Sequence, residues 1–470
     1  MNSSYDNAPA ARNPARKLES LVGPSALRQR AWSTGFIKRA RKMDPATLIL
    51  AALATFAAGR PWSETSIRDS CCQRMESAGL EGLNREVFHD HISKPSFAAM
   101  CRDLYSAVSR AAGMGELDQG AELVRAVASK LPISDIACVD GTEIRVPPSL
   151  RDEFKDKGET SGSLMIHSMH SLKSCAESQF SIGAGTSCER TAMLDMDLKG
   201  LLVMADAGYF SAEVCQELER RGAWHVIKVP DSNACRVIDC QKVGRSTGAG
   251  KVAHAREIMG GSMPDAKDLI SKNCSYDLNA STAGGFEHRE AIVRRQDAEG
   301  RFGHGRFATN ILDAIQISDL YRARWQIELQ FKCFKSFSSL KADRIATPSI
   351  IEAFIDLSRT VHALNLVIGQ AAQQAAGAAL SQQKAAGRCS AILEDLPGML
   401  IKGSARLAGR IKRFLCGAAT RLAKSTLSFI NRKRGKCLSC IIESIRMKSR
   451  TALVHIPALP AQAGPSPATA

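Results

Sequence analysis

Apolar residues recur at helical spacing through the first quarter of the chain. Asp44 followed by Pro45 is a typical helix start, because aspartate caps the first turn and proline fits its first position. The stretches that follow the same pattern cover residues 47–58, 63–78 and 95–112. We therefore expect a helical domain over residues 31–128, preceded by a loose basic arm over residues 1–30.

Short apolar runs bounded by polar residues replace the helical pattern after Leu131. They cover residues 136–139, 165–170, 177–182, 201–205, 224–229, 291–295 and 306–309. Runs of about four to eight apolar residues are typical of buried strands. Ser211 stands where it can cap a helix from Ala212 to Arg220, so strands alternate with a helix. This order predicts an α/β domain with a mixed sheet.

Residues 231–306 interrupt the α/β pattern, because they are rich in Gly, Ser, Asn and Asp. Together with the short strand candidates inside them, they predict a mainly β insertion. It divides the α/β domain into a first part over residues 131–230 and a second part over residues 307–385. In the second part, two strong helical patterns run over residues 317–337 and 350–372.

The distribution of charge indicates the kind of partner. The chain carries 63 Lys and Arg against 47 Asp and Glu, which gives a net charge of +16. Residues 384–450 alone hold 16 basic and 3 acidic residues, interleaved with apolar ones. This pattern predicts a basic helical C-terminal region over 386–450 and a disordered Pro-rich tail over 451–470. Such a surplus indicates a polyanionic partner, which is nucleic acid or, less often, an anionic membrane surface. The helical domain over 31–128 is interpreted as a DNA-binding domain, and the alternative is a soluble helical domain with a solvated basic arm.

Composition argues against several other classes of protein. Hydrophobic residues make up 44% of the chain, too many for a wholly disordered protein. The longest apolar run, residues 46–58, is shorter than the ~20 residues of a membrane span. The N-terminus lacks the apolar core of a secretory signal, and the odd number of cysteines, 15, indicates reduced thiols. We expect a cytoplasmic protein without a membrane partner.

The helix expected over residues 317–337 carries candidate chemistry on one face. On a wheel of ~100° per residue, polar side chains fall on a single stripe about 80° wide. They are Tyr321, Arg324, Glu328, Lys332 and Lys335. The other faces are strongly apolar, so much of this helix must be buried. Taken alone, a glutamate among these cations also fits a structural ladder of salt bridges.

Two aspartates at strand ends change that interpretation. Asp140 follows the run at 136–139, and Asp206 follows the run at 201–205. Polar groups at strand ends of α/β sheets commonly point into a functional crevice, where these two can meet Glu328. Three close carboxylates repel one another unless divalent cations bind them. Two such ions, about 3.5–4 Å apart, can hold the attacking and leaving oxygens of a phosphoryl transfer.

The spacing Tyr321-x2-Arg324-x3-Glu328-x6-Lys335 resembles the Y-R-E-K signature of DDE transposases of bacterial insertion sequences, within the insertion-sequence-four family. The resemblance covers roughly residues 30–450. It implies a ribonuclease-H-like fold of the retroviral integrase superfamily: a mixed five-stranded sheet with helices on both faces, interrupted by the β insertion and flanked by helical terminal regions.

Two further motifs support this resemblance. Asp206-Ala-Gly-Tyr-Phe is similar to the family's second aspartate motif, and Asp140-Gly-Thr is similar to the first. One departure is Ala207, where many relatives carry arginine, and this puts one local contact in doubt but not the metal site. The order of the motifs, two aspartates, a β-rich insertion and then the glutamate helix, also matches the family.

The resemblance implies specific roles for these residues. The metal ligands would be Asp140, Asp206 and Glu328, which would bind two Mg²⁺ ions, with Mn²⁺ as a possible substitute. The contacts to DNA phosphates would come from Tyr321, Arg324 and Lys335. Lys332 lies on the same stripe, so we expect it to bind DNA as well. A tyrosine nucleophile is disfavoured, because the three carboxylates would then be redundant.

The implied activity is that of a cut-and-paste transposase in bacteria. It would cut both strands at the inverted terminal repeats of an insertion sequence and join the 3′ ends to target DNA. Its partners would be double-stranded DNA and a second copy of the chain, as a homodimer on paired ends associated with the nucleoid. Two alternatives stay open: a catalytically silent DNA-binding regulator derived from a transposase, and a ribonuclease-H-like nuclease without strand transfer.

Overall fold

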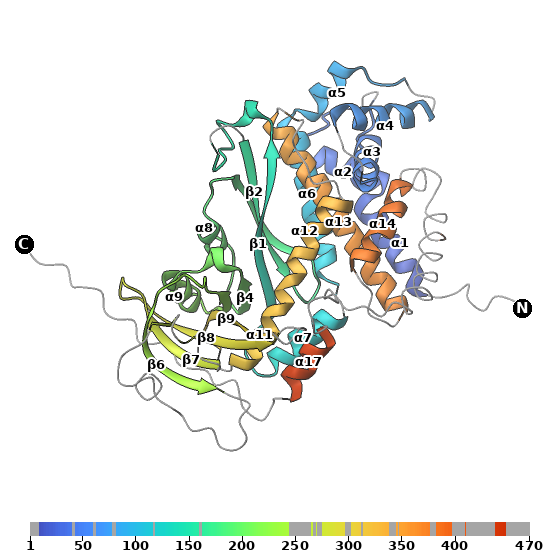
Figure 1. The fold of residues 1–470 in the computed structure, drawn as a ribbon. Coiled ribbons are helices and arrows are strands. Elements are labelled where there is room, and N and C mark those ends of the chain that lie inside the picture. The colour runs from blue at the N-terminus through green and yellow to red at the C-terminus, as the bar shows by residue number, and fades with distance from the viewer. Residues whose placement is uncertain are drawn as a thin grey trace, which may run out of the picture. The chain divides into compact units, whose positions relative to one another are not determined.

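The fold is described from a computed structural model of the chain (Figure 1). The residues it describes are 9–39, 43–59, 63–77, 81–115, 118–158, 162–243, 265–266, 269, 275–296, 302–311, 314–337, 345, 347–376, 382–396, 409 and 438–447. They belong to two compact units. The first lies within Met1–Val124, Cys138–Ala192 and Trp325–Cys440, and the second within Arg125–Ala137, Met193–Arg324 and Ile441–Ala470.

Helices make up most of the first unit. Those before its strands are α1 (Pro9–Val22), α2 (Pro24–Ser33), α3 (Pro45–Ala57), α4 (Glu64–Ser77), α5 (Arg85–Ile92), α6 (Pro95–Gly113) and most of α7 (Asp118–Ala128). Those after its strands are α12 (Trp325–Phe337), α13 (Pro348–Ala376) and α14 (Gln382–Glu394). As the sequence predicts, Asp44 is the N-cap residue of α3 and Pro45 is its first residue. The helical patterns at 63–78 and 95–112 correspond to α4 and α6.

The 29-residue helix α13 lies at the centre of this helical layer. It packs against α1, α3, α6 and α14, and Figure 1 shows it in orange beside α6. Its apolar side chains, such as Ile351, Phe354 and Leu364, are fully buried. Nearly all side chains between Ile350 and Gln370 are buried, polar ones such as Arg359 and His362 included, so each face of the helix must find a partner away from water.

The expected loose arm over residues 1–30 is wrong for the described residues, because 9–22 and 24–33 form the helices α1 and α2. Leu18, Val22 and Leu27 are fully buried in the first unit. Proline at the first position of each helix is compatible with helix formation. The prediction relied on the high content of Pro, Ala, Arg and Ser. It overlooked the few apolar residues, which recur at helical spacing and pack in the core.

Three hydrogen-bonded strands complete the first unit, in the order β3-β2-β1. The strands are β1 (Asp135–Val146, whose first three residues belong to the second unit), β2 (Gly162–Ser171) and β3 (Glu177–Ala184). The 3₁₀ turn η1 (Pro148–Leu150) follows β1. The prediction that a strand ends at Asp140 is wrong, because β1 continues through Val146. Residues 142–146 alternate between buried and exposed side chains, which is the pattern of a half-buried strand.

A buried ion pair connects α13 to β3 inside the first unit. The Arg359 guanidinium donates to the Glu177 carboxylate, with 2.9 Å between Nε and Oε2, and both side chains are at most 3% exposed. Tyr105 and Ser168 also donate their hydroxyls to Glu177. Burial alone would raise the pKa of Glu177, but Arg359 and the hydroxyl donors hold it below its usual value. Asp356 contacts the other side of the guanidinium, 3.1 Å from it.

The second unit is built on a large mixed sheet. Its strands are β4 (Leu201–Ala205), β5 (Trp224–Lys228), β6 (Arg236–Val243), β7 (Ser275–Ser281), β8 (Glu287–Gln296) and β9 (Phe302–Thr309). They are hydrogen-bonded in the order β4-β5-β9-β8-β7-β6. The pair β4 and β5 is parallel, and the other pairs are antiparallel. Figure 1 shows β6 to β9 as successive strands of one layer. The mixed α/β character expected from the sequence is confirmed.

Two helices of the second unit pack on this sheet. The helix α9 (Ala212–Arg220) contacts β5 and β8, and α11 (Ala314–Tyr321) contacts β7 and β8. The Ser211 side chain accepts a hydrogen bond from the Val214 amide at 3.2 Å, so the N-cap and the bounds of α9 agree with the prediction. The short α8 (Glu189–Leu194) and α17 (Leu438–Met447) each continue from one unit into the other along the chain.

The single helix expected over residues 317–337 is interrupted. The helix α11 ends at Tyr321, the 3₁₀ turn η4 spans Arg322–Arg324, and α12 begins at Trp325. A 3₁₀ turn advances by ~120° per residue, so the helical wheel does not apply across residues 322–324. The expected single stripe is therefore wrong as a geometric statement, although each of its residues lies in a helical segment.

Other predictions lie wholly or mostly outside the described residues. Only short parts of the basic region over 386–450 are described, and the tail over 451–470 is not. No helix in the described part of the chain is long and apolar enough to cross a membrane. Among the cysteines that the structure describes, none forms a disulfide.

Candidate active site

Asp206 stands directly after the buried strand β4, where the sequence predicts it. Its backbone is extended, with φ −82° and ψ 178°, and the 3₁₀ turn η2 (Ala207–Tyr209) begins at the next residue. The side chain is 45% exposed. Four of the five residues of β4 are buried, so a well-packed strand fixes the backbone from which this carboxylate projects toward solvent.

Two residues of the predicted signature contact this carboxylate inside the second unit. The single proton of the Tyr321 hydroxyl is shared between two acceptors, Asp206 Oδ1 at 3.2 Å and the Ala205 carbonyl at 3.3 Å. The Arg324 guanidinium lies 3.8 Å from Asp206 Oδ2. The Phe307 ring of β9 packs on Tyr321, with 4.8 Å between centroids. The end of α11 and the η4 turn therefore bring a hydroxyl and a cation to the end of β4.

The electrostatics of this group favour a donor role for the tyrosine. Burial and the neighbouring Asp206 carboxylate raise the pKa of Tyr321 well above its usual value, although Arg324 acts in the opposite direction. The phenol therefore stays protonated at neutral pH. Arg324 is only 9% exposed, yet its contact with Asp206 is longer than a direct hydrogen bond. Asp206 thus keeps coordination capacity on its exposed side.

The other predicted residues lie in the first unit. Asp140 is in β1 and is partly exposed, and its Oδ1 accepts a hydrogen bond from the Gly141 amide at 2.9 Å. Glu328 lies in the first turn of α12 and is also partly exposed. A negative charge is favourable at that end of a helix, because the first backbone amides are without helical partners.

Lys332 and Lys335 are exposed on α12, four and seven residues after Glu328. This spacing puts the three side chains on one face of the helix. The Lys332 ammonium lies 4.8 Å from the centre of the Trp325 ring, which is a cation–π contact. Part of the predicted stripe is therefore present within α12 itself, with one carboxylate and two exposed cations.

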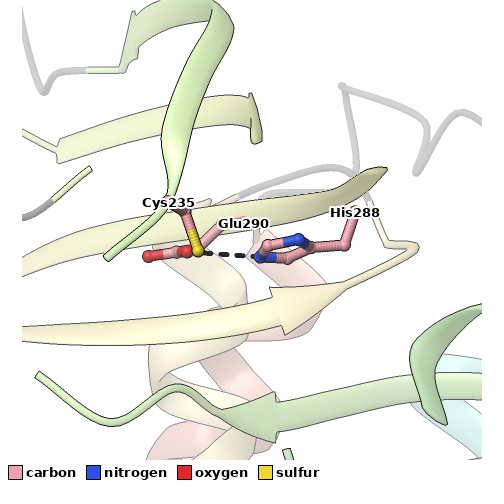
Figure 2. A group of neighbouring side chains, drawn as sticks. All are labelled: Cys235, His288 and Glu290. Carbon is pink, nitrogen blue, oxygen red and sulfur yellow. Dashed lines mark ion pairs between the residues drawn. The ribbon is translucent and has the colours of Figure 1, made fainter. Parts of the chain in front are cut away.

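A second group of side chains was not predicted from the sequence. Cys235, His288 and Glu290 each offer one ligand atom, and these atoms lie within 4.8 Å of one another inside the second unit (Figure 2). All three residues are buried. The available signal was His288-x-Glu290, which puts both side chains on one face of a strand. The strand was predicted over residues 291–295, so His288 and Glu290 fell before its start, whereas β8 begins at Glu287.

Arg306 of β9 completes the surroundings of this group. It forms an ion pair with Glu290 in which both side chains are 0% exposed, and its Nη1 donates to the Asn233 carbonyl at 2.8 Å. Burial would raise the pKa of Glu290, but the neighbouring His288 and Arg306 side chains hold it below its usual value. Burial, assisted by Glu290, raises the pKa of the Cys235 thiol to about 11.

Comparison with known proteins identifies the class of this chain. The family model described as "Transposase DDE domain" matches residues 132–366, half of the chain. The transposase for insertion sequence element IS231B of Bacillus thuringiensis subsp. berliner is 23% identical over 67% of this chain and 70% of its own length. The transposase for insertion sequence element IS421 of Escherichia coli is 26% identical over 76% of this chain and 92% of its own length.

A solved structure is also similar over most of the chain. A chain of the piggyBac transposase synaptic complex with hairpin DNA covers 91% of this chain, and this chain covers 88% of it. The TM-score is 0.40 and the sequence identity is 10%.

These matches define the class as a metal-dependent, DNA-cleaving transposase of insertion sequences. The chain belongs to the DDE transposase family. The resemblance noted in the sequence is thereby confirmed at the level of the family, and a DDE domain implies dependence on a divalent metal.

Proposed function

We propose that this transposase cuts DNA at the inverted terminal repeats of an insertion sequence and joins the 3′ ends to target DNA. The proposed metal ligands are Asp140, Asp206 and Glu328, with two Mg²⁺ ions as the natural cofactor and Mn²⁺ as a substitute. The observation that carries the proposal is the group at the end of β4, where Asp206 is contacted by Tyr321 and Arg324.

The donor set fits hard divalent cations. The three proposed ligands are carboxylates, and the oxygen atoms of carboxylates are the protein ligands that Mg²⁺ prefers. Each of the three side chains is partly exposed, so an ion and a phosphate oxygen can reach it. Asp206 in particular is held by one hydroxyl and one distant guanidinium. When bound, the ions would polarise the phosphodiester and lower the pKa of a bound water.

The remaining signature residues would position DNA. Arg324 has the fork of donors that suits a phosphate group, and it already lies beside Asp206. Tyr321 stays protonated, so its hydroxyl donates a hydrogen bond and does not act as a nucleophile. Lys332 and Lys335 project from α12 into solvent, where they would neutralise phosphates.

Further parts of the proposal concern fold and assembly. We propose a ribonuclease-H-like catalytic core over residues 131–230 and 307–385, with the β insertion at 231–306. The helical domain over 31–128 and the basic region over 386–450 would bind DNA. The active form would be a homodimer on two paired ends, associated with the bacterial nucleoid.

Strand cleavage on a labelled duplex that carries the element's terminal repeat tests the proposal. The wild type and the Glu328→Gln variant are compared with Mg²⁺, with Mn²⁺ and with EDTA. We expect nicking at the end of the element in the wild type with either metal, and none with EDTA or in Glu328→Gln. The matched control is Glu213→Gln, which neutralises an exposed carboxylate in the first turn of α9 and should leave nicking unchanged.

The same assay separates transposition from simple hydrolysis. Unlabelled target DNA is added to the cleaved ends, and joined products are resolved by size. Joining of 3′ ends to the target supports the transposase reaction, and cleavage without joining indicates a nuclease. Specific binding to the repeat without cleavage by either metal would contradict the proposed catalytic roles and indicate a regulatory binder.

A further inference from the structure

The group formed by Cys235, His288 and Glu290 has no place in the transposition chemistry described above. It lies in the second unit and contains none of the proposed catalytic residues. His288 and Glu290 project from the same face of β8, because they are two residues apart, and Cys235 directly precedes β6 (Figure 2). Cys235 is far from the other two residues in sequence, so folding of the β6–β9 segment is what brings the three together.

The His288 imidazole is the unusual member of this group. Its side chain is 1% exposed, and neither ring nitrogen has a hydrogen-bond partner within ordinary limits. The nearest acceptor is Glu290 Oε2, 3.5 Å from Nε2. Buried imidazole nitrogens are normally satisfied, and a metal ion is one of the partners that can satisfy them.

The spacing of the donor atoms matches a small tetrahedral ion. Zinc-to-ligand distances of about 2.0–2.1 Å to nitrogen and oxygen put two ligand atoms about 3.4 Å apart. The separation of 3.5 Å between His288 Nε2 and Glu290 Oε2 is close to that value. The Cys235 sulfur lies within 4.8 Å of both, so a small side-chain movement would bring it to the longer distance of a zinc–sulfur bond.

The neighbouring residues are compatible with a bound cation. Arg306 donates to both oxygens of the Glu290 carboxylate, but each oxygen has two lone pairs, so a guanidinium and a metal can share the group. The Asn233 amide donates to the Cys235 sulfur at 2.8 Å, which stabilises negative charge on that atom. A hydrogen-bond donor to a metal-bound group is a common supporting contact.

We propose that Cys235, His288 and Glu290 bind one zinc ion, with a structural role that is separate from the catalytic metals. A thiolate, an imidazole and a carboxylate are the ligands of zinc, whereas the proposed catalytic ions are held by oxygen atoms only. The thiolate and the carboxylate offset the charge of the dication, and the Arg306 guanidinium leaves the loaded group with a net charge of +1. The fourth position is open to a water molecule.

The zinc ion would connect strands that do not touch directly. Cys235 precedes β6, and His288 and Glu290 lie in β8, while β7 lies between the two strands in the sheet. The site lies beside the turn that joins β7 to β8, where Ala280 pairs with His288. The ion would therefore link the start of β6 to β8 across β7, at one end of the sheet.

Zinc content of the full-length protein tests this inference independently of cleavage. The wild type is purified from zinc-supplemented medium, and metal is measured by mass spectrometry. We expect about one zinc per chain in the wild type, and a loss of at least ~10-fold in Cys235→Ser and His288→Gln. The matched controls are Cys240→Ser, which alters another buried cysteine of the same core cluster, and Cys437→Ser, which alters the only CxxC pair. Both should retain zinc.

X-ray absorption on the zinc-loaded wild type keeps the test independent of how the variants fold. One sulfur neighbour together with nitrogen and oxygen neighbours supports the site. No sulfur, or two or more, overturns it. Wild-type protein that binds no zinc also overturns it, as does a loss in Cys240→Ser or Cys437→Ser equal to that in Cys235→Ser. Asp206→Asn should keep its zinc while losing cleavage, so failure of one proposal is distinguishable from failure of the other.

Discussion

Two carboxylates of the second unit each lie beside an arginine, but one is partly exposed to solvent and the other is fully buried. Asp206 is 45% exposed and lies 3.8 Å from Arg324. Glu290 is 0% exposed, and Arg306 donates to both of its oxygens. The first carboxylate keeps lone pairs available on its exposed side, while the second is held by a charge-assisted pair inside the protein.

This difference in burial determines which of the two carboxylates can bind ligands that exchange with solvent. Bringing a charge out of water is costly, so a buried carboxylate must have its partner before any ligand arrives. An exposed carboxylate at a strand end carries no such requirement, and it can exchange water for a metal or a phosphate-bound ion. Asp206 therefore fits a catalytic ligand, and Glu290 fits a structural one.

The largest effect is expected for Asp206→Asn. Loss of a metal ligand should remove several kcal/mol of transition-state stabilisation, so strand cleavage should fall by ~10³-fold or more. The free energy of unfolding should change by less than about 0.5 kcal/mol, because the side chain is exposed. Cleavage rates and urea unfolding measure both quantities, with the exposed Asp195→Asn as control. An unchanged cleavage rate would remove Asp206 from the site.

The next largest effect concerns stability. Arg306→Met leaves Glu290 buried without its cation, which should cost about 3–5 kcal/mol in the free energy of unfolding. Urea unfolding of chelator-treated protein measures this change, so that bound metal does not compensate for the missing charge. A decrease in the free energy of unfolding below about 1 kcal/mol would show that water reaches Glu290. The two carboxylates would then not differ in their need for an arginine partner.

Arg324→Met is the matched change at the exposed carboxylate. Asp206 remains in contact with water, so the free energy of unfolding should fall by no more than about 1 kcal/mol. Cleavage should nevertheless decrease by ~10–10²-fold, because one charged donor to phosphate is lost. If Arg324→Met destabilises the protein as much as Arg306→Met does, Arg324 has a structural role.

The smallest effect is expected for Tyr321→Phe. The change removes one hydrogen bond to Asp206 and keeps the ring that packs on Phe307. A single hydrogen bond contributes about 0.5–1.5 kcal/mol, so cleavage should fall by roughly threefold to tenfold. Complete loss of cleavage, with DNA binding intact, would instead indicate a covalent role for the hydroxyl.

Local signals explain what the sequence predicted correctly. The β4 strand, Asp206 and the helix α9 follow one another within 20 residues, and each depends on short-range features: an apolar run, a strand end and the Ser211 cap. These features are decided by neighbouring residues, so pattern analysis finds them.

Features that depend on tertiary contacts were missed. The strand β1 passes through Asp140 because residues 142–146 pack as an alternating strand, a pattern that the polar Asp-Gly pair obscured. The break at η4 accompanies the approach of Arg324 to Asp206, and no residue in it is a helix breaker. The group around Cys235 combines distant residues, so only the folded chain shows it.

The ion pair between Arg359 and Glu177 also determines the alignment of α13. A slide of α13 by one turn, about 5.4 Å, would move the guanidinium away from Glu177 and leave that carboxylate buried without its cation, while Asp356 on the same helix would stay beside Arg359. Insertion of one residue ahead of Arg359 would rotate it by ~100° with the same result. Apolar contacts alone would fit several registers of this helix, and the pairing of buried Arg359 with Glu177 permits a single one.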